Sequence, residues 1–455
     1  MLAEALRTAP DGLAEAFTLI DGLDDVLVHG LARIDEERAA ALESFTAAFA
    51  GSPLADRVTD SIGKIIAGTV TDEHLAVLAG ARAALTGAVH DALLGRLDEA
   101  LGRSRPPWAA PAEPAGAGHL LAGGRSWLRE LALAGWRGVD HELAGGGARA
   151  IQALLAEPAG RRAAVLLDGF AAELRSAAPV ATLDRIPVRR WADLWTRAVL
   201  LSQDTFPGSG SLPADGRLLL LGVDLHEHPT VFRAQAHGLL EAPGGEVRLV
   251  RVSVAAAKVD TISGASAWRM LSAFPVFRQA LAGQRTVEVS GMPLTAAGDL
   301  LWDESRAVPG EPADPFAVAR VRLGGVTAPA VAPLDRHPAV IAEPVLLEGY
   351  TAGAESFELG GVTLAVDTDR LPEAGPITPA LLAASTACLG LLRWDAGRWT
   401  VQPLAVQAVV RRKPVVAHTG DWALGPTEPK AAKAEAAAGT AVDVLRERAG
   451  RLLRK

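Results

Sequence analysis

The chain of 455 residues contains a single cysteine, so no disulfide can form within it. Cys388 lies in an apolar neighbourhood, AASTACLGLL, which predicts an inert core thiol rather than a nucleophile. No apolar run approaches the roughly 18 residues that span a membrane. The first residues, MLAEALRTAPDGLAEAF, carry acids where a signal peptide carries basic residues. We therefore expect a cytoplasmic protein with no membrane partner.

The chain also lacks an excess of positive charge. Its net charge is -8, and its isoelectric point lies near 5.8. This balance argues against general affinity for nucleic-acid phosphates, so we expect no nucleic-acid partner. An apolar content of 49% is ample for a buried core, and the length predicts two or three domains.

Motifs of common catalytic machinery are scarce as well. Neither a GxSxG nor an HExxH pattern occurs. GGGARA at residues 145–150 fits GxGxxA, but a helical pattern precedes it where a dinucleotide fold needs a strand. Gly63 and Lys64 are followed by Ile65 instead of the serine or threonine of a phosphate loop. Catalysis therefore has little support in the sequence.

The first half of the chain has apolar residues at helical spacing. Residues 1–103 predict one helical domain and residues 119–204 a second, in which each tryptophan has apolar partners three or four positions away. This spacing predicts core packing for those tryptophans. Residues 104–118, rich in proline and alanine, and residues 205–216, rich in glycine, proline and serine, predict linkers after the first and second helical domains.

The pattern changes to strands in the stretch GRLLLLGVDLHEHPTVFRAQAHGLLEAPGGEVRLVRVSV at residues 216–254. The continuous apolar run 218–221 predicts a buried strand, and a hairpin around the Pro-Gly-Gly turn follows. A helix interrupted at Pro275 is expected over 265–281, and further strands at 286–289, 318–323, 340–347, 357–366, 391–394 and 399–410. Trp394 and Trp399 flank an Asp-Ala-Gly turn, which predicts a tight hairpin with facing rings. We expect residues 217–425 to form an α+β domain.

An internal repeat is suggested inside this domain. HisProThrVal at 228–231 recurs as HisProAlaVal at 337–340, and LeuLeuGlu follows each copy. ProLeu recurs at 293–294 and 403–404 with nearly the same offset. These anchors predict a tandem duplication with copies at about 226–300 and 335–410.

The last segment, residues 426–455, is rich in alanine, lysine and glutamate and predicts a helix. Val442, Leu445, Ala449 and Leu452 form a narrow apolar stripe along it. The helix either docks on a partner or neighbouring subunit, or stands in solvent. The sequence leaves the oligomeric state open.

The densest set of candidate metal ligands is Asp224, His226 and His228. On a strand, residues two apart share a face, so the three side chains would converge. Three protein ligands with one open position are typical of a catalytic divalent metal such as zinc. His228 also precedes Pro229, and the extended geometry required there gives the histidine a purely structural explanation. The copy around His337 places Pro333 and Asp335 at the other two positions, which favours the structural interpretation.

The stretch GRWTVQPLAVQAVV at 397–410, together with the helical first half, resembles uncharacterised proteins of GC-rich bacteria encoded beside MoxR-type AAA+ ATPases and SWIM zinc-finger proteins. The resemblance is one of overall style, carries no diagnostic motif and brings no active-site residues. It implies an accessory or adaptor component of an AAA+ ATPase-linked assembly.

These observations predict a multidomain α+β protein with an all-helical N-terminal half and a β-rich second half. Our first hypothesis is a non-enzymatic interaction, adaptor or scaffold protein with protein partners and no cofactor. The alternative is a metal-dependent hydrolase with Asp224, His226 and His228 as ligands.

Overall fold

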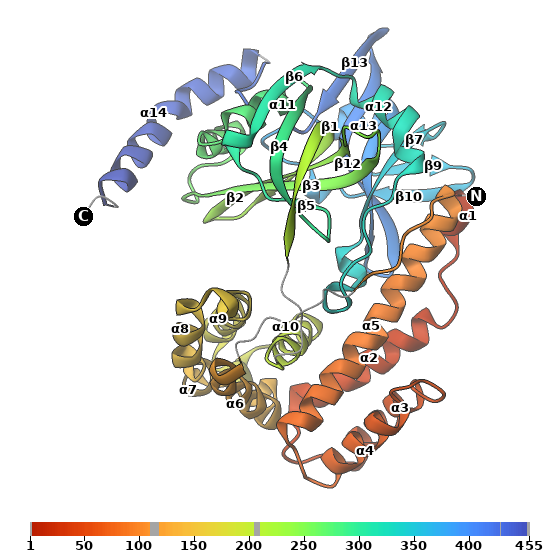
Figure 1. Cartoon of the computed structure of the whole chain (residues 1–455), viewed down its shortest axis with the longest axis vertical. Helices are drawn as coiled ribbons and strands as arrows, with labels where there is room; N and C mark the ends of the chain where they lie inside the picture. The colour runs from red at the N-terminus through yellow and green to blue at the C-terminus, as the bar shows by residue number, and fades with distance from the viewer. Residues whose placement is uncertain (1, 110–117, 204–209, 428, 453–455) are drawn as a thin grey trace.

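The computed structural model has a helical half followed by a half built from two β-sheets (Figure 1). It describes residues 2–109, 118–203, 210–427 and 429–452. The predicted fold class, a helical N-terminal half ahead of a β-rich α+β half, is confirmed. Most of the linker predicted at 104–118 and the first part of the one at 205–216 lie outside the described residues. The last part of the second predicted linker, from Ser211 to Gly216, belongs to strand β1.

The helical half follows the apolar periodicity of the sequence, and several helices begin at a side-chain cap. Asp35, Thr71 and Asp140 each accept a hydrogen bond from a backbone N–H of the first turn of their helix. The helices are α1 (Leu2–Arg7), α2 (Leu13–His29), α3 (Glu36–Ala47), α4 (Ala55–Ile66), α5 (Asp72–Leu101), α6 (Gly118–Ala134), α7 (His141–Gly145), α8 (Ala148–Ala156), α9 (Arg161–Ala177) and α10 (Val188–Leu201).

One hydrophobic core runs through this half, from Leu23 in α2 to Val199 in α10. Trp136 lies fully buried near its centre, with ring centroids 5.9 Å from Phe170 and 6.3 Å from Trp191. The core role predicted for the tryptophans is confirmed by Trp127, Trp136, Trp191 and Trp195. The two helical segments thus share a single core on either side of the predicted linker.

Helix α5, with 30 residues, connects the two halves. Its first turns pack in the helical core, whereas Val89, Leu93 and Leu97 join the core of the second sheet. Among the described helices it is the one whose length and apolarity match a membrane span, but more than half of its apolar window is buried inside the protein. This packing is typical of a core helix.

The first sheet closes on itself into a small barrel. Its strands are β1 (Ser211–Glu227), β2 (Val231–Glu241), β3 (Val247–Ala257), β4 (Arg285–Thr295), β5 (Asp299–Leu300) and β6 (Ala307–Pro312). The order is β1-β2-β3-β5-β4-β6, and β4 also pairs with β1. β3 pairs with β5 in parallel, and the short helix α11 (Pro275–Ala282) lies between β3 and β4. This is the strand order of a five-stranded Greek-key barrel of the OB type.

The second sheet has the order β7-β11-β12-β10-β9-β8, with β13 paired to β12. Its strands are β7 (Ala342–Glu348), β8 (Thr351–Ala352), β9 (Ser356–Leu359), β10 (Val362–Val366), β11 (Ser385–Asp395), β12 (Arg398–Val410) and β13 (Lys413–His418). The short helix α13 (Pro379–Ala383) precedes β11, and β10 pairs with β12 in parallel. The hairpin predicted around the Asp-Ala-Gly turn is confirmed, because Trp394 pairs with Trp399 at a centroid distance of 5.3 Å.

The two sheets share one pattern of connections. In the first sheet, α11 is followed by the antiparallel pair β4–β5, and β5 pairs in parallel with β3, the strand before the helix. In the second sheet, α13 is followed by the antiparallel pair β11–β12, and β12 pairs in parallel with β10. The sequence anchors, however, occupy different strands. His228 precedes β2 and His337 precedes β7, while Pro293 lies in the fourth strand of the first sheet and Pro403 in the last strand of the β11–β12 hairpin. The tandem duplication of about 226–300 and 335–410 therefore stays a prediction.

One predicted strand is wrong. Residues 318–322 belong to α12 (Pro315–Arg322), and Leu323 begins the 3₁₀ turn that follows it. The helix starts here because Pro315 stands in the first turn and the Asp314 side chain accepts a hydrogen bond from the N–H of Phe316. The helix predicted at 265–281 is split as Pro275 suggested, into a 3₁₀ segment (Gly264–Leu271) and α11.

An irregular segment, residues 326–341, attaches the sheets to the helical half. Asp335 lies 3.2 Å from Arg162 of α9 and 2.7 Å from Arg197 of α10. Arg336 pairs with Asp91 of α5 over 2.8 Å, and His337 lies 3.1 Å from Asp193 of α10. We refer to residues 326–341 as the strap.

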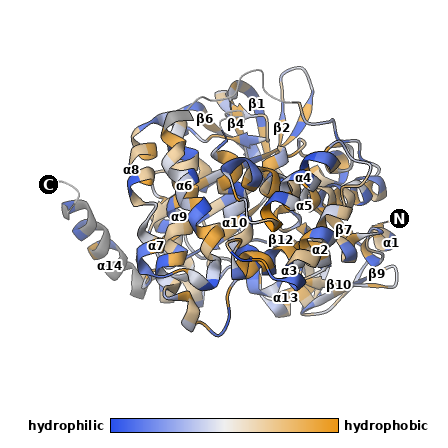
Figure 2. Cartoon of the chain, turned by 90° about the horizontal axis from the view of Figure 1, so that it is seen from below, coloured by the Kyte–Doolittle hydropathy of each residue, from blue (hydrophilic) through white to orange (hydrophobic). Residues whose placement is uncertain are grey.

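The predicted C-terminal helix is present as α14 (Pro429–Leu452). It extends away from the body of the protein in both views (Figures 1 and 2). Arg269 attaches it through Glu435 over 3.2 Å and Asp443 over 3.6 Å. The side chains of the predicted stripe, Val442, Leu445, Ala449 and Leu452, lie outside those that the structure describes.

Candidate functional site

The candidate site predicted from the sequence lies on β1, which is buried on both faces from Leu218 to Leu225. Leu218 and Leu220 belong to the core of the first barrel. Leu219 and Leu221 belong to an apolar cluster that α12 and the second sheet complete. The continuous apolar run of the sequence is thus explained, because neither face of β1 meets solvent between Leu218 and Leu225.

β1 and β12 approach each other at Gly222. A Cβ atom at this position would lie 2.6 Å from the Cβ of Leu404, so a glycine is required. Because alternate residues of a strand share a face, Asp224 and His226 point to the same side as Gly222. They therefore face the second sheet.

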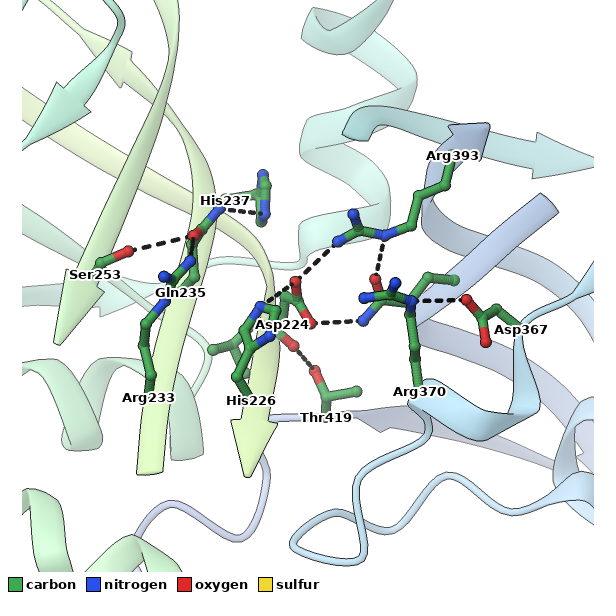
Figure 3. Close-up of polar contacts among 12 residues, drawn as sticks. Asp224, His226, Arg233, Gln235, His237, Ser253, Asp367, Arg370, Arg393 and Thr419 are labelled. Carbon is green, nitrogen blue, oxygen red and sulfur yellow. Dashed lines mark hydrogen bonds and ion pairs between the residues drawn. The ribbon is translucent and has the colours of Figure 1, made fainter. Parts of the chain in front are cut away.

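Both carboxylate oxygens of Asp224 accept hydrogen bonds there (Figure 3). Gln402 donates to Oδ1 over 2.6 Å, and Arg393 donates to Oδ2 over 2.9 Å. The Nε2 atom of His226 lies 2.9 Å from Oδ2 and is the donor, since an ionised carboxylate only accepts. Arg393 also donates to the side-chain oxygen of Gln402 over 2.6 Å. We call Asp224, His226, Arg393 and Gln402 the inter-sheet cluster.

The electrostatics of this cluster keep Asp224 ionised. Burial raises the pKa of its carboxyl group, but the hydrogen bond and charge of His226 and the charge of Arg393 lower it by more, so the pKa lies well below its usual range. Asp224 and Gln402 are each 2% exposed. Beside them the Thr419 hydroxyl, 1% exposed, donates to the Val223 carbonyl over 2.5 Å. The chemistry of the cluster is that of a buried, charge-assisted connection between two sheets.

The three predicted metal ligands are only partly brought together. Asp224 and His226 are in contact, whereas His228 is exposed at the β1–β2 turn. Both oxygens of Asp224 are engaged by donors that a metal ion would have to displace. Within the described part of the chain, no group of three His, Cys, Asp or Glu side chains is arranged to hold a metal ion. In this arrangement Asp224, His226 and His228 do not form a three-ligand site.

A cavity of about 320 Å³ lies where the helical half, the barrel and the strap meet. Buried His90 of α5 and His237 of β2 line it, together with three arginines that each face a carboxylate. The pairs are Arg105–Glu343 at 3.1 Å, Arg197–Asp335 at 2.7 Å and Arg251–Asp299 at 2.9 Å. Because these charges balance, the cavity selects no ligand of one sign.

His237 is held neutral beside this cavity. Burial lowers its pKa to about 3; Asp224 opposes this shift, and Arg251, Arg393 and His226 add to it. The folded protein therefore binds fewer protons at this site than the unfolded chain, whose histidine titrates near 6.5. The stability that depends on neutral His237 is complete above that value and is lost as the pH falls from there toward 3.

We expect wild-type protein to lose about 1 kcal/mol more stability per pH unit than the His237→Gln variant between pH values of roughly 6 and 4. Urea unfolding at a series of pH values measures this difference. Asp224 is present in both proteins, so its own contribution to the slope cancels in the comparison. Parallel pH profiles for the two proteins would contradict the assignment of a neutral histidine.

Sequence reasoning placed Asp224 and His226 correctly on one strand face but missed their partners. Arg393 and Gln402 follow Asp224 by 169 and 178 positions. Both lie in strands whose periodicity was recognised, yet no local signal links them to β1. The available hint is that Arg393 and Gln402 each stand between apolar residues of their strands.

Comparison with protein-family models, curated proteins and solved structures found no match.

Proposed function

We propose that this protein is a non-enzymatic interaction protein, an adaptor or scaffold. One observation supports this proposal: buried charged side chains of the protein join separate parts of the molecule. Asp224 and Arg393 connect the two sheets, and Arg105 and Glu343 connect the segment after α5 to β7. Charges used in this way fix the relative positions of the parts, which a scaffold requires to present its surfaces.

The partners that we propose are proteins, and the setting is cytoplasmic. The resemblance noted in the sequence suggests an AAA+ ATPase-linked assembly. Helix α14 supports a docking role, because it leaves the body and is attached through the ion pairs of Arg269 with Glu435 and Asp443 (Figure 2).

Affinity capture with the tagged full-length protein tests this function. Mass spectrometry identifies the captured partner, and the tagged partner is then used to capture this protein in return. We expect a stable complex that forms in both directions. A broad hydrolase screen provides the opposing measurement. Turnover that one point substitution abolishes would end the adaptor proposal.

The alternative is a metal-dependent hydrolase that uses Asp224, His226 and His228. It retains one favourable observation, the 2.9 Å contact between His226 and Asp224. Elemental analysis distinguishes the two functions, and we expect well below one zinc, iron or manganese ion per chain in wild-type protein. Stoichiometric metal that disappears in His226→Ala would instead establish the hydrolase site. His29→Ala is the control, because His29 is a half-exposed histidine of α2, in the helical half.

A further inference from the structure

The hairpin of β12 and β13 ends in an exposed tip that combines apolar and basic side chains. Val409, Val410 and Val416 are exposed by 52%, 38% and 48%. Between them lie Arg411, Arg412 and Lys413, which are all exposed. We call these six residues and Pro414 the hairpin tip. Single exposed apolar side chains are normal on a protein surface, but exposed apolar side chains grouped in one place often mark a contact site, and these three valines lie beside one turn.

The cations of the tip have no acidic neighbour in the hairpin. From Arg398 to His418 the sequence contains no aspartate or glutamate, although the whole chain has a net charge of -8. Among the described residues, no ion pair or side-chain hydrogen bond involves Arg411, Arg412 or Lys413. Arg320 of neighbouring α12, in contrast, is bound by Glu348 and Gln407. The tip is therefore a patch of unneutralised positive charge on an acidic protein.

The geometry makes this patch accessible. β11 pairs with β12 only as far as Ala408, so the tip is a two-stranded ribbon beyond the sheet. In Figure 1 this ribbon extends at the top of the view past the neighbouring elements. Among the described strands β13 pairs with β12 alone, which leaves its outer edge open to an added strand.

The turn itself holds its two arginines at a conformational cost. Arg411 and Arg412 have φ angles of 51° and 65°, the left-handed pair that a two-residue turn of type I′ requires. Asn-Gly is the favoured pair for this turn, and a larger side chain costs about 1 kcal/mol per residue there. The tip thus carries charge where a smaller residue would be more stable.

We propose that the hairpin tip binds an extended acidic and apolar segment of a partner protein. This inference rests on the proposed interaction function and identifies its surface. Positive charge selects acidic side chains, the exposed valines provide apolar contact, and the open edge of β13 supplies backbone hydrogen bonds. An anionic membrane fits less well, because the tip contains no tryptophan, tyrosine or phenylalanine to anchor at a bilayer surface.

The test uses the full-length protein and a short fluorescent peptide of alternating glutamate and valine, with binding measured by fluorescence anisotropy. We expect binding that weakens as salt increases. R411N/R412G removes two charges and installs the favoured turn pair, so affinity falls about tenfold or more while the melting temperature is unchanged or higher. V416T is expected to weaken binding through lost apolar contact, with the β-branched shape retained.

R398Q is the matched control, since Arg398 is an exposed arginine in the opposite hairpin of the same sheet, and it should leave affinity unchanged. The proposal is overturned if the peptide does not bind, if R411N/R412G binds as wild type does, or if a lysine-valine peptide binds equally well. Binding to phosphatidylglycerol vesicles in place of the peptide would assign the tip to a membrane instead. If R411N/R412G still binds a captured partner as wild type does, the assignment of the binding surface to the hairpin tip is overturned, but the interaction function is not. Turnover in the hydrolase screen would overturn the interaction function itself.

Discussion

Replacing Asp224 with alanine is expected to lower the free energy of unfolding by about 3–5 kcal/mol, because Arg393 would remain buried without its carboxylate. Arg393 has a side-chain exposure of 12%, and its contact with Asp224 is 2.9 Å long. Asp224→Asn keeps one of the two accepting oxygens, so a smaller loss of stability is expected from it. Urea unfolding at neutral pH, followed by tryptophan fluorescence, measures both changes.

Asp260→Asn is the control for this experiment. Asp260 is an exposed aspartate after β3, and no hydrogen bond or ion pair of its side chain occurs among the described residues. Its replacement should change stability by less than about 0.5 kcal/mol. If Asp224→Ala were as stable as Asp260→Asn, the inter-sheet cluster would not hold the two sheets together.

Replacing Arg82 with methionine is expected to cost the helical half about 3–5 kcal/mol as well. Arg82 and Asp24 are each 2% exposed and are joined by two hydrogen bonds of 2.6 and 2.9 Å. Asp193 accepts a third, at 2.6 Å. Burial lowers the pKa of Arg82, but these carboxylates raise it by more, so the guanidinium stays charged. Burial already raises the pKa of Asp24 to about 6 against the lowering effect of Arg82. Removal of Arg82 would leave the Asp24 carboxyl group in the core of the helices without its donors, either as an unpaired charge or as a protonated acid.

The double variant Asp24→Leu with Arg82→Met separates the cost of losing the ion pair from the cost of leaving the Asp24 carboxyl group without a partner. It should recover at least half of the loss, because apolar residues of similar size often replace a buried ion pair without cost. Lys64→Met is the surface control, since Lys64 and Asp60 are 52% and 62% exposed and their pair contributes at most about 1 kcal/mol. If the single and double variants lost the same free energy of unfolding, the packing of the Arg82 side chain, and not its charge, would be the source of its stabilising effect.

Local sequence signals predicted the elements well where one local rule decides the structure. The facing pair Trp394 and Trp399 followed from the Asp-Ala-Gly turn, and the split at Pro275 followed from its missing N–H. The error at 318–323 arose because alternating Val and Arg favour a strand, although Asp314 and Pro315 indicate the start of a helix. β13 was missed because Arg411 and Arg412 do not resemble a turn, since such turns usually contain asparagine or glycine.

The candidate site was predictable in part. Alternation along β1 placed Asp224 and His226 on one face, which is a local property of any strand. His228 does not share that face, because the chain turns toward β2 at Pro229 and the His228 side chain is exposed there. What surrounds Asp224 depends on a second sheet whose strands follow much later in the chain.

By itself the sequence determined the broad order, a helical half ahead of a β-rich half, since hydrophobic period, caps and turn residues act over a few positions. It also determined that the Leu218–Leu221 part of β1 is buried, through an unbroken apolar run. Only the tertiary structure decided that the helical segments share one core, that the first sheet closes, and that Asp224 meets Arg393 and Gln402. The physical reason is the same in each case: these contacts join residues tens to hundreds of positions apart, and their free energy exists only once separate elements have packed together.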